Sequence, residues 1–466
     1  MRINRRRKVR GEIRAAIPGI ALLSMSLATS GGCKTLPDVD RGMPVTDSAQ
    51  TATQERLADR CSRPMIDDAV AAMARHLACD QLINADSPLV AGNKLTLLQD
   101  GPATYAAMFA AIRSARDHIN LETYIFDDDE IGAQFADLLL ERSAAGVQVN
   151  LIYDSVGGLL TPPAFFARLR DGGVAVLEFN PVNPLNERGG DWLLNNRDHR
   201  RQLLIDGHTA FTGGVNISDS YASAPLRHSR KGAPPQLSGW RDTHLRIEGP
   251  VVAAFQRMFI ETWRRQNGAP LAPRDYFPAL SPQGDQPVRV VGSSPRDPQN
   301  LIYLSLISAI SHAQSQVHLT IAYFAPDPQL LQAMKQAAAR GIDVVLILPS
   351  HTDSWAIFHL GRSYYTQLLR SGVRIHERRG AVMHAKTASI DGVWSTVGST
   401  NLDWRSLLHN DEINAVILSH GFAARMGQMF AADLGESDAI TLAGWRQRSL
   451  WMRVKERTAR LGAYWL

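Results

Sequence analysis

The chain has 466 residues, of which 45% are hydrophobic and 20% are charged, so it is long enough for more than one domain with a sizeable core. Its formal net charge is +5, but residues 1–32 alone contribute +6. The rest of the chain is nearly neutral, at −1, which gives no support to a nucleic-acid-binding body, and no nucleic acid is expected as a partner.

Residues 1–32 have the pattern of an export signal. An arginine-rich start precedes an apolar run from Ile17 to Ala28, which is short for a transmembrane helix. Small residues then lead to Cys33, and this arrangement resembles a bacterial lipoprotein signal. The resemblance implies that Cys33 is acylated and that the protein lies in the bacterial cell envelope, on the periplasmic side and anchored to a membrane. A plain signal peptide, an uncleaved anchor and twin-arginine export stay open as alternatives.

Two segments separate this leader from the folded body. Residues 33–60 are rich in small and polar residues, which predicts a flexible tether. Residues 61–95 are predicted to be an N-terminal helical segment, because apolar side chains recur at helical spacing between positions 62 and 78. This segment holds Cys61 and Cys79, which form either a disulfide or two free buried thiols. No cluster of cysteine and histidine has metal-site spacing, so neither a metal nor a cofactor is expected.

From about residue 90 the chain alternates strands and helices, and the pattern repeats. The first unit reads as a helix at 105–117, a strand at 119–126, a helix at 131–145 and a strand at 147–153. Similar segments recur about 200 residues later, as the pairs 111–115 and 309–313, 142–147 and 338–342, and 169–174 and 369–373. This internal duplication predicts an α/β fold with two similar lobes, at 96–270 and 285–436, each with a mixed sheet flanked by helices. The active site is expected at the interface between them.

Each lobe also carries one copy of the same motif, His-x-(Lys/Arg) followed by an Asp-Gly turn and then by Gly-(Gly/Ser)-x-Asn. The second copy contains His384, Lys386, Asp391, Ser399 and Asn401, and the first contains His199, Arg201, Asp206, Gly214 and Asn216. We predict a short strand in each case, on which the histidine and the basic residue share one face. An imidazole beside a fixed cation, followed by small residues whose backbone N–H groups can approach an anion, suits phosphoryl chemistry.

Two further carboxylates are candidates for orienting the imidazoles. Aligning the halves places Asp242, in Trp-Arg-Asp, opposite Glu412, in Asn-Asp-Glu. A carboxylate beside a catalytic histidine fixes its tautomer and raises its basicity. The motif residues Asp206 and Asp391 are predicted to hold the local structure of the Asp-Gly turns instead.

The duplicated motif is similar to the signature of the phospholipase D superfamily, and the resemblance spans residues from about 100 to 435. Within that superfamily, the stretches at 120–124, 240–250 and 398–406 most resemble bacterial cardiolipin synthases and related phosphatidyltransferases. The resemblance implies a covalent mechanism on phospholipid substrates at a membrane surface, without a metal or a cofactor.

The same resemblance implies roles for individual residues. His199 would attack phosphorus to give a phosphohistidine, while His384 would protonate the leaving alcohol. Positive charge from Arg201 and Lys386 would neutralise the phosphoryl oxygens. The remaining contacts to the substrate would come from Asn216, Asn401, Gly214 and Ser399. Because the two halves are near mirror images, the residues alone leave open which histidine is the nucleophile.

The implied reaction transfers a phosphatidyl group to a glycerol hydroxyl of a second lipid and so makes a cardiolipin-type phospholipid. A phospholipase D that hydrolyses phospholipid to phosphatidic acid is the main alternative. A secreted phosphodiesterase or nuclease and an inactive lipid-binding lipoprotein are further alternatives. The inactive alternative is suggested by Arg201, because the family has lysine there and the arginine fork needs different room.

Three remaining segments have a structural and a functional interpretation. Insertions at 183–192 and 220–236 flank the first motif and either select the substrate or are tolerated surface loops. Residues 437–466 form a basic amphipathic segment that either contacts a membrane surface or packs against the body. An apolar stripe at helical spacing predicts a core-facing helix and consists of Phe255, Phe259 and Trp263.

Overall fold

The structure is a computed structural model that describes residues 35–37, 55–61, 69–84, 87–183, 185–186, 193–225, 239–297 and 299–465. The leader with Cys33 and most of the tether lie outside the described residues, as do large parts of both insertions. The expectations for those segments therefore stay predictions.

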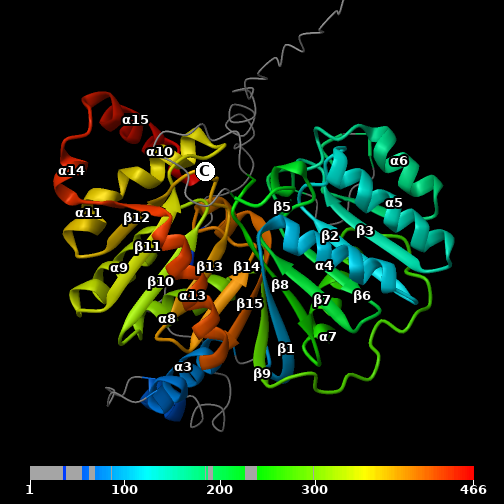
Figure 1. Ribbon diagram of the computed structural model, residues 1–466, viewed down its shortest axis with the longest axis horizontal. Coiled ribbons are helices and arrows are strands. Elements are labelled where there is room, and N and C mark those ends of the chain that lie inside the picture. The colour runs from blue at the N-terminus through cyan, green and yellow to red at the C-terminus, as the bar shows by residue number, and fades with distance from the viewer. Residues whose placement is uncertain are drawn as a thin grey trace, which may run out of the picture.

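The strands of both lobes form one 16-stranded sheet (Figure 1). The strands of the first lobe are β1 (Val90–Gln99), β2 (His118–Thr123), β3 (Gln148–Asp154), β4 (Ala175–Phe179), β5 (Arg197–Asp198), β6 (Gln202–Ile205), β7 (Thr209–Gly213) and β8 (Thr243–Glu248). Those of the second lobe are β9 (Gln286–Ser293), β10 (Gln316–Ile321), β11 (Asp343–Pro349), β12 (Arg374–Arg378), β13 (Lys386–Ile390), β14 (Trp394–Gly398), β15 (Asn410–Leu418) and β16 (Ser437–Ile440). The first lobe reads β4-β3-β2-β6-β7-β8-β1 across the sheet and the second reads β12-β11-β10-β13-β14-β15-β9, so both halves of the duplication share one topology.

The two lobes meet edge to edge rather than face to face. β1 and β9 pair in antiparallel fashion, with Val90 opposite Val288, so the two mixed sheets that were expected are continuous. The backbone N–H and C=O groups of these edge strands thereby satisfy each other. Because β1 begins at Val90, the first lobe starts before the predicted boundary at residue 96.

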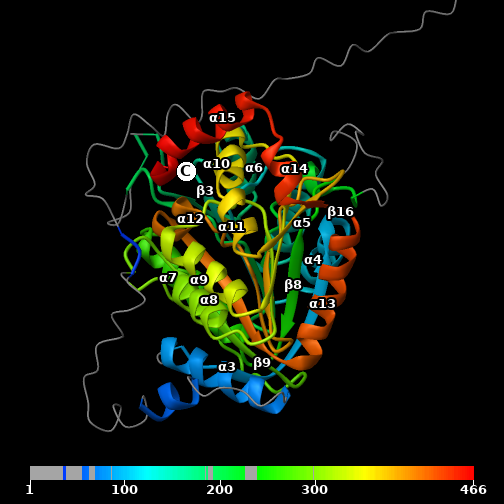
Figure 2. The same ribbon diagram turned by 90° about the vertical axis from the view of Figure 1, so that its left-hand side faces the viewer.

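Helices cover both faces of the sheet. The helices of the first lobe are α4 (Asp100–Ser114), α5 (Glu130–Ala144), α6 (Pro163–Asp171), the short η2 (Asp219–Tyr221) and α7 (Val252–Arg265). Those of the second lobe are α8 (Leu301–Ser311), α9 (Pro328–Ala339), α10 (Trp355–Ser363), α11 (Tyr365–Arg370), α12 (Trp404–Leu408) and α13 (His420–Gly435). Figure 2 shows α8 and α9 on one face of the second lobe and α13 on the other. The stripe formed by Phe255, Phe259 and Trp263 on α7 is buried, as predicted, in a core that also contains Phe422 of α13 and so spans both lobes.

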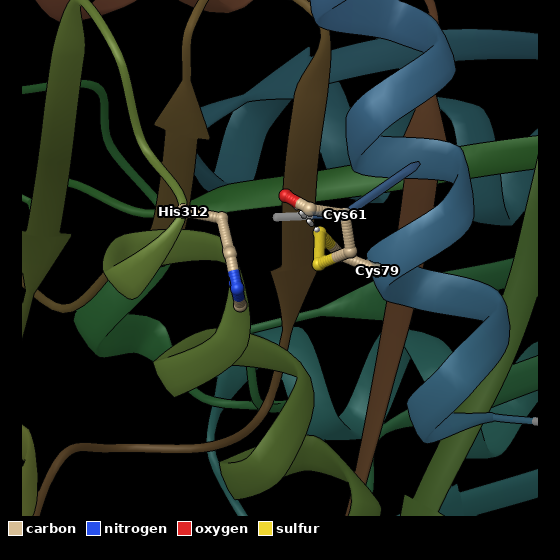
Figure 3. A group of neighbouring side chains, drawn as sticks. All are labelled: Cys61, Cys79 and His312. Atoms are coloured by element: carbon tan, nitrogen blue, oxygen red, sulfur yellow. Dashed lines mark hydrogen bonds between the residues drawn. A yellow bond between two sulfur atoms is a disulfide. The ribbon is translucent and has the colours of Figure 1, made fainter. Parts of the chain in front are cut away.

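The N-terminal segment is helical and is cross-linked. Residues 55–61 and α3 (Ala69–Ile83) are helices, and a disulfide joins Cys61 to Cys79. Figure 3 shows this bond beside His312, at the end of α8. The three side chains lie close enough to share a metal ion. Because both sulfur atoms are bonded to each other, however, neither is available as a thiolate ligand.

The C-terminal segment packs against the second lobe along part of its length. It consists of β16, α14 (Leu442–Arg446), α15 (Leu450–Leu461) and η4 (Ala463–Trp465). Trp445 is buried in the core of the lobe, so packing against the body, one of the two interpretations of this segment, explains this tryptophan. None of the helices in the described part of the chain combines the length and apolar character needed to cross a bilayer.

Candidate active site

The sheet topology places both motif histidines at the same edge. β6 runs antiparallel to β2, with Gln202 opposite Glu122, and β13 runs antiparallel to β10, with Lys386 opposite Ile321. Each motif strand therefore starts where a parallel strand of its lobe ends. The prediction that the histidines lie on these strands was wrong by two to three residues, because β6 begins at Gln202 and β13 at Lys386. His199 and His384 lie in the connecting segments just before the strands.

Backbone pairing between the lobes holds these segments in place. The backbone N–H of His199 donates to the carbonyl of Asp411 at 2.9 Å, just after β5 pairs in parallel with the start of β15. The second copy repeats this arrangement, because Met383 forms a bridge to Arg241 and the N–H of His384 donates to the Arg241 carbonyl at 2.8 Å. The residue next to each bridging carbonyl is one of the two candidate carboxylates.

Each imidazole consequently binds a carboxylate from the opposite lobe. His199 Nδ1 lies 2.8 Å from Glu412 Oε1, and His384 Nδ1 lies 2.7 Å from Asp242 Oδ2. Both carboxylates are fully buried. The sequence pointed to these two residues as orienting groups, and the structure adds that the pairs cross the lobe boundary. Neither lobe can complete a histidine–carboxylate pair on its own.

The two basic residues contact the rings differently. Arg201 Nη2 donates to His199 Nε2 at 2.9 Å, and its Nε donates to Asn216 Oδ1 at 2.8 Å. Arginine can only donate, so Nε2 of His199 is an acceptor and Nδ1 carries the proton that is donated to Glu412. Lys386 Nζ lies 3.0 Å from both ring nitrogens of His384 and donates to the carbonyl of that residue.

Of the four predicted substrate-binding residues, two are asparagines near the histidines, and the other two lie against the orienting carboxylates. Asn216 is held by Arg201, whereas Asn401 is buried with an Oδ1 atom that has no hydrogen-bond partner among the described residues. Ser399 Oγ donates to Glu412 Oε2. A Cβ atom at Gly214 would come within 2.1 Å of Asp242 Oδ1. Ser399 and Gly214 therefore support and accommodate the orienting carboxylates, and their predicted contacts with a substrate phosphate stay predictions.

The motif carboxylates lie at the opposite ends of their strands. Asp206 accepts hydrogen bonds from the backbone N–H groups of residues 116–118, and Asp391 accepts them from residues 314–316. Both have positive φ angles, of 52° and 51°, in the left-handed region that Asp tolerates in turns. Asp391 also binds His76 Nε2 of α3 at 2.8 Å. These contacts are those of turn-stabilising residues.

Burial controls the protonation of the site. It lowers the pKa of His199 well below its usual range, an effect to which Arg201 adds, and it lowers that of His384 to about 4, helped by Lys386. Burial also raises the pKa of Glu412 to about 8. Asp242 differs, because the charge and hydrogen bond of His384 outweigh its burial and leave its pKa below the usual value. Both imidazoles are therefore neutral at neutral pH before substrate binds.

Aromatic residues that no sequence motif assigned to the site complete it. Tyr221, in η2 at the start of the second insertion, places its hydroxyl 3.0 Å from His384 Nδ1 and receives a hydrogen bond from Asn216 Nδ2. The ring of Tyr124 lies 5.1 Å from His199, and that of Trp240 lies 5.1 Å from His384. The only signal for Tyr221 was its place in an insertion beside the motif.

Residues 108–225 and 306–434, which include both motifs, match the family described as "Cardiolipin synthase, PLD-like domain". The chain belongs to this family. Membership in the cardiolipin synthase family confirms the resemblance seen in the duplicated motif and accounts for the repeated topology.

Individual relatives agree with this assignment. The chain is 33% identical to the major cardiolipin synthase of Bacillus subtilis over 385 residues, covering 82% of this chain and 77% of the relative. It is 35% identical to cardiolipin synthase A of Pseudomonas entomophila over 377 residues, covering 80% and 75%. Among solved structures, phosphatidylserine synthase of Haemophilus influenzae has a TM-score of 0.63 at 13% identity, covering 84% of this chain and 100% of that protein. This last likeness concerns the fold alone, and it confirms the two-lobed α/β class.

Proposed function

We propose that the protein is a phosphatidyltransferase that makes a cardiolipin-type phospholipid through a phosphohistidine intermediate. The observation that carries this proposal is the pair of histidine–carboxylate contacts across the lobe boundary, each with a cation at the ring. Such a site offers two imidazoles with opposite tasks and positive charge for a phosphoryl group between them. The cardiolipin synthases that share about a third of its sequence support the choice of lipid substrate.

In the first half-reaction, Nε2 of His199 attacks the phosphorus of phosphatidylglycerol. Nε2 has a lone pair because the ring proton is on Nδ1 and is donated to Glu412, and this lone pair exchanges its hydrogen bond from Arg201 for the bond to phosphorus. The P–O bond to glycerol breaks. His384 takes up a proton at Nε2 when the anionic phosphodiester binds, gives that proton to the departing alkoxide and is left neutral. Asp242 stabilises the proton on His384 before this transfer. The products are phosphatidyl-His199 and free glycerol.

In the second half-reaction, His384 is neutral and acts as a base. It takes the proton from a glycerol hydroxyl of a second phosphatidylglycerol, and the oxygen attacks the phosphorus of phosphatidyl-His199. The P–N bond breaks, which releases cardiolipin and restores neutral His199. Arg201 and Lys386 neutralise charge on the phosphoryl oxygens in both half-reactions. The intact contacts of Arg201 with His199 and Asn216 favour a working first motif over the inactive alternative.

The test uses the purified protein with vesicles of phosphatidylglycerol, with and without phosphatidylethanolamine, and product identification by mass spectrometry. Cardiolipin should form, and both His199→Ala and His384→Ala should abolish it, whereas the matched variant His208→Ala, at an exposed histidine, should not. A covalent phosphate on denatured His384→Ala protein would identify His199 as the nucleophile. Phosphatidic acid as the only product would replace the transferase with the hydrolase.

We also propose that the protein is an exported lipoprotein of the cell envelope, on the periplasmic side and anchored through acylated Cys33. Its support is the leader sequence, in which a basic start, a short apolar run and small residues precede Cys33. Metabolic labelling with a radioactive fatty acid tests this proposal. The label should appear on the wild-type chain and be absent from Cys33→Ala.

A further inference from the structure

The two histidines lie along the border of the sheet where its parallel strands end, and this border, here called the histidine edge, also carries most of the exposed apolar side chains. β2, β3 and β4 are parallel, as are β10, β11 and β12, so the loops that follow these strands emerge at the edge where His199 and His384 lie. Eleven large hydrophobic residues are exposed among the described residues, and nine of them belong to these loops or to the C-terminal segment that packs beside them.

In the first lobe the exposed residues follow β3 and β4. Leu159 and Leu160, after β3, are 54% and 81% exposed, and Leu185, after β4, is 90% exposed. Asn186, next to Leu185, is tied to Glu178 by a 2.8 Å hydrogen bond, so this loop is attached to the end of β4. An apolar loop tip that is held in place but covered by nothing in the described structure is costly in water.

In the second lobe the exposed residues lie on α10 and α15. Trp355 begins α10 after β11 and is 52% exposed. α15 packs along α10, with Arg460 bonded to Ser363, and Figures 1 and 2 show both helices at one end of the molecule.

α15 turns its apolar side toward solvent, whereas an ordinary surface helix turns its apolar side toward the core. Leu450, Val454 and Leu461 share one side of the helix and are exposed, and Trp451 lies next to them. On the opposite side Ala459 is buried against the body. Exposed Arg453 flanks the apolar side, and exposed Arg457 lies within it, one turn from both Val454 and Leu461. A helix with an outward apolar face and basic flanks is typical of a helix in a membrane interface.

The start of the described chain lies at the same edge. Leu36 is buried in the core of the second lobe, and the carbonyl of Pro37 accepts a 3.0 Å hydrogen bond from Gln329 in the first turn of α9. α9 begins after β10, at the histidine edge. Leu36 stands three positions after Cys33, which itself lies outside the described residues. An acyl anchor on Cys33 would hold this edge toward a membrane.

We propose that the histidine edge is a docking surface for a phospholipid bilayer. The apolar tips of the first lobe, Trp355 and the outer face of α15 enter the interfacial layer of the bilayer, while the basic residues of α15 contact anionic headgroups. The site between the lobes then faces the depth at which phosphodiester groups lie. The choice of a phospholipid bilayer as the occupant rests on the proposed function, and a second protein copy is the competing occupant.

The experiment uses the full chain with Cys33→Ser, which removes acylation, and phosphatidylglycerol vesicles in a sedimentation assay. The docking variant combines Leu160→Ser, Trp355→Ser and Trp451→Ser. The matched control combines Val70→Ser and Phe277→Ser, which change exposed apolar residues away from this edge. Phe277 follows Tyr276, whose ring packs on His118 at the opposite end of β2.

The docking variant should lose at least tenfold in vesicle partitioning, and its turnover of dispersed short-chain phosphatidylglycerol should stay within twofold of the parent. The control should match the parent in both measurements. Unchanged partitioning of the docking variant would overturn the proposal, as would a parent that self-associates in light scattering through these residues without binding vesicles. Vesicle partitioning is measured without turnover. If the docking variant loses partitioning while the parent shows no turnover of phosphatidylglycerol, the docking surface is supported and the proposed transferase activity is rejected.

Discussion

Glu412 of the second lobe lies 2.8 Å from Nδ1 of His199 in the first lobe, and Ser399 holds its other carboxylate oxygen. The contact matters because it sets the His199 tautomer in which Nε2 carries no proton and accepts a hydrogen bond from Arg201. Asp242 makes the reciprocal contact to His384. Each histidine therefore receives its carboxylate partner from the other copy of the duplication.

Replacing Glu412 by Gln should lower kcat by about 100-fold to 10,000-fold, because an amide can donate to Nδ1 and favour the wrong tautomer. The same change at an exposed position of α7, Glu261→Gln, should leave kcat unaltered. Steady-state cardiolipin formation measures both, with circular dichroism to verify folding. Normal kcat in a folded Glu412→Gln protein would contradict the orienting role.

Lys386 should give the enzyme an alkaline limit. Burial lowers its pKa to about 7, so raising the pH through this value removes a positive charge that the phosphoryl group needs. We expect kcat/KM to fall about tenfold per pH unit above that point, since this ratio follows the free enzyme. In Lys386→Arg the fall should move to much higher pH, because arginine stays charged. Lys94→Arg, at a lysine whose side chain is 59% exposed, is the control and should keep the parent profile.

Arg201 should be replaceable by lysine but not by alanine. Arg201→Ala removes the cation at His199 and the partner of Asn216 and should reduce kcat/KM at least 100-fold, roughly the effect of removing one transition-state donor. Arg201→Lys keeps the charge and should retain activity within about tenfold. Arg246→Ala, at a partly exposed arginine of β8, serves as the comparison. A fully active Arg201→Ala protein would show that the first motif does not contact the phosphate.

Tyr221 should act on His384 by positioning it. Tyr221→Phe removes a hydroxyl 3.0 Å from Nδ1, and losing one hydrogen bond of about 1 kcal/mol should lower kcat about fivefold. KM should change little, because the hydroxyl contacts the imidazole. Tyr276→Phe, which removes a hydroxyl that donates to the backbone carbonyl of Ala272 and does not contact either histidine of the site, should not change kcat. A purely structural role would lower the melting temperature and leave kcat of the folded enzyme intact.

Asp391 should contribute to stability more than to chemistry. Burial alone would raise its pKa, but the hydrogen bond and charge of His76 outweigh burial and lower it to about 2. Because the folded pKa is below the unfolded one, this stabilisation is complete above about pH 4 and is lost as the pH falls toward 2, amounting to about 2 kcal/mol. Asp391→Asn should lower the melting temperature more than Asp206→Asn, which has no histidine partner in the hydrogen bonds described. Equal decreases in melting temperature for the two variants would show that the contact with His76 adds no stability.

The sequence alone determined the duplication, the α/β class and the two histidines and two carboxylates of the candidate site, because period, spacing and motif are properties of the linear chain. His199, His384, Asp242 and Glu412 could all be found by aligning the two halves. The disulfide between Cys61 and Cys79 was one of two open outcomes until the geometry of the N-terminal helices was available.

Only the tertiary structure decided which residues meet. The pairing of β1 with β9 joins the lobes into one sheet, and the parallel contact of β5 with β15 brings Glu412 to His199, over a separation of 213 residues. Such contacts depend on how two sheets dock, which no local pattern encodes. The same reason explains why the contacts of Ser399 and Gly214 with the carboxylates and of Tyr221 with His384 were not predicted. The partners of Ser399 and Gly214 lie on other segments of the same lobe, and the partner of Tyr221 lies in the other lobe. Only folding brings these segments together.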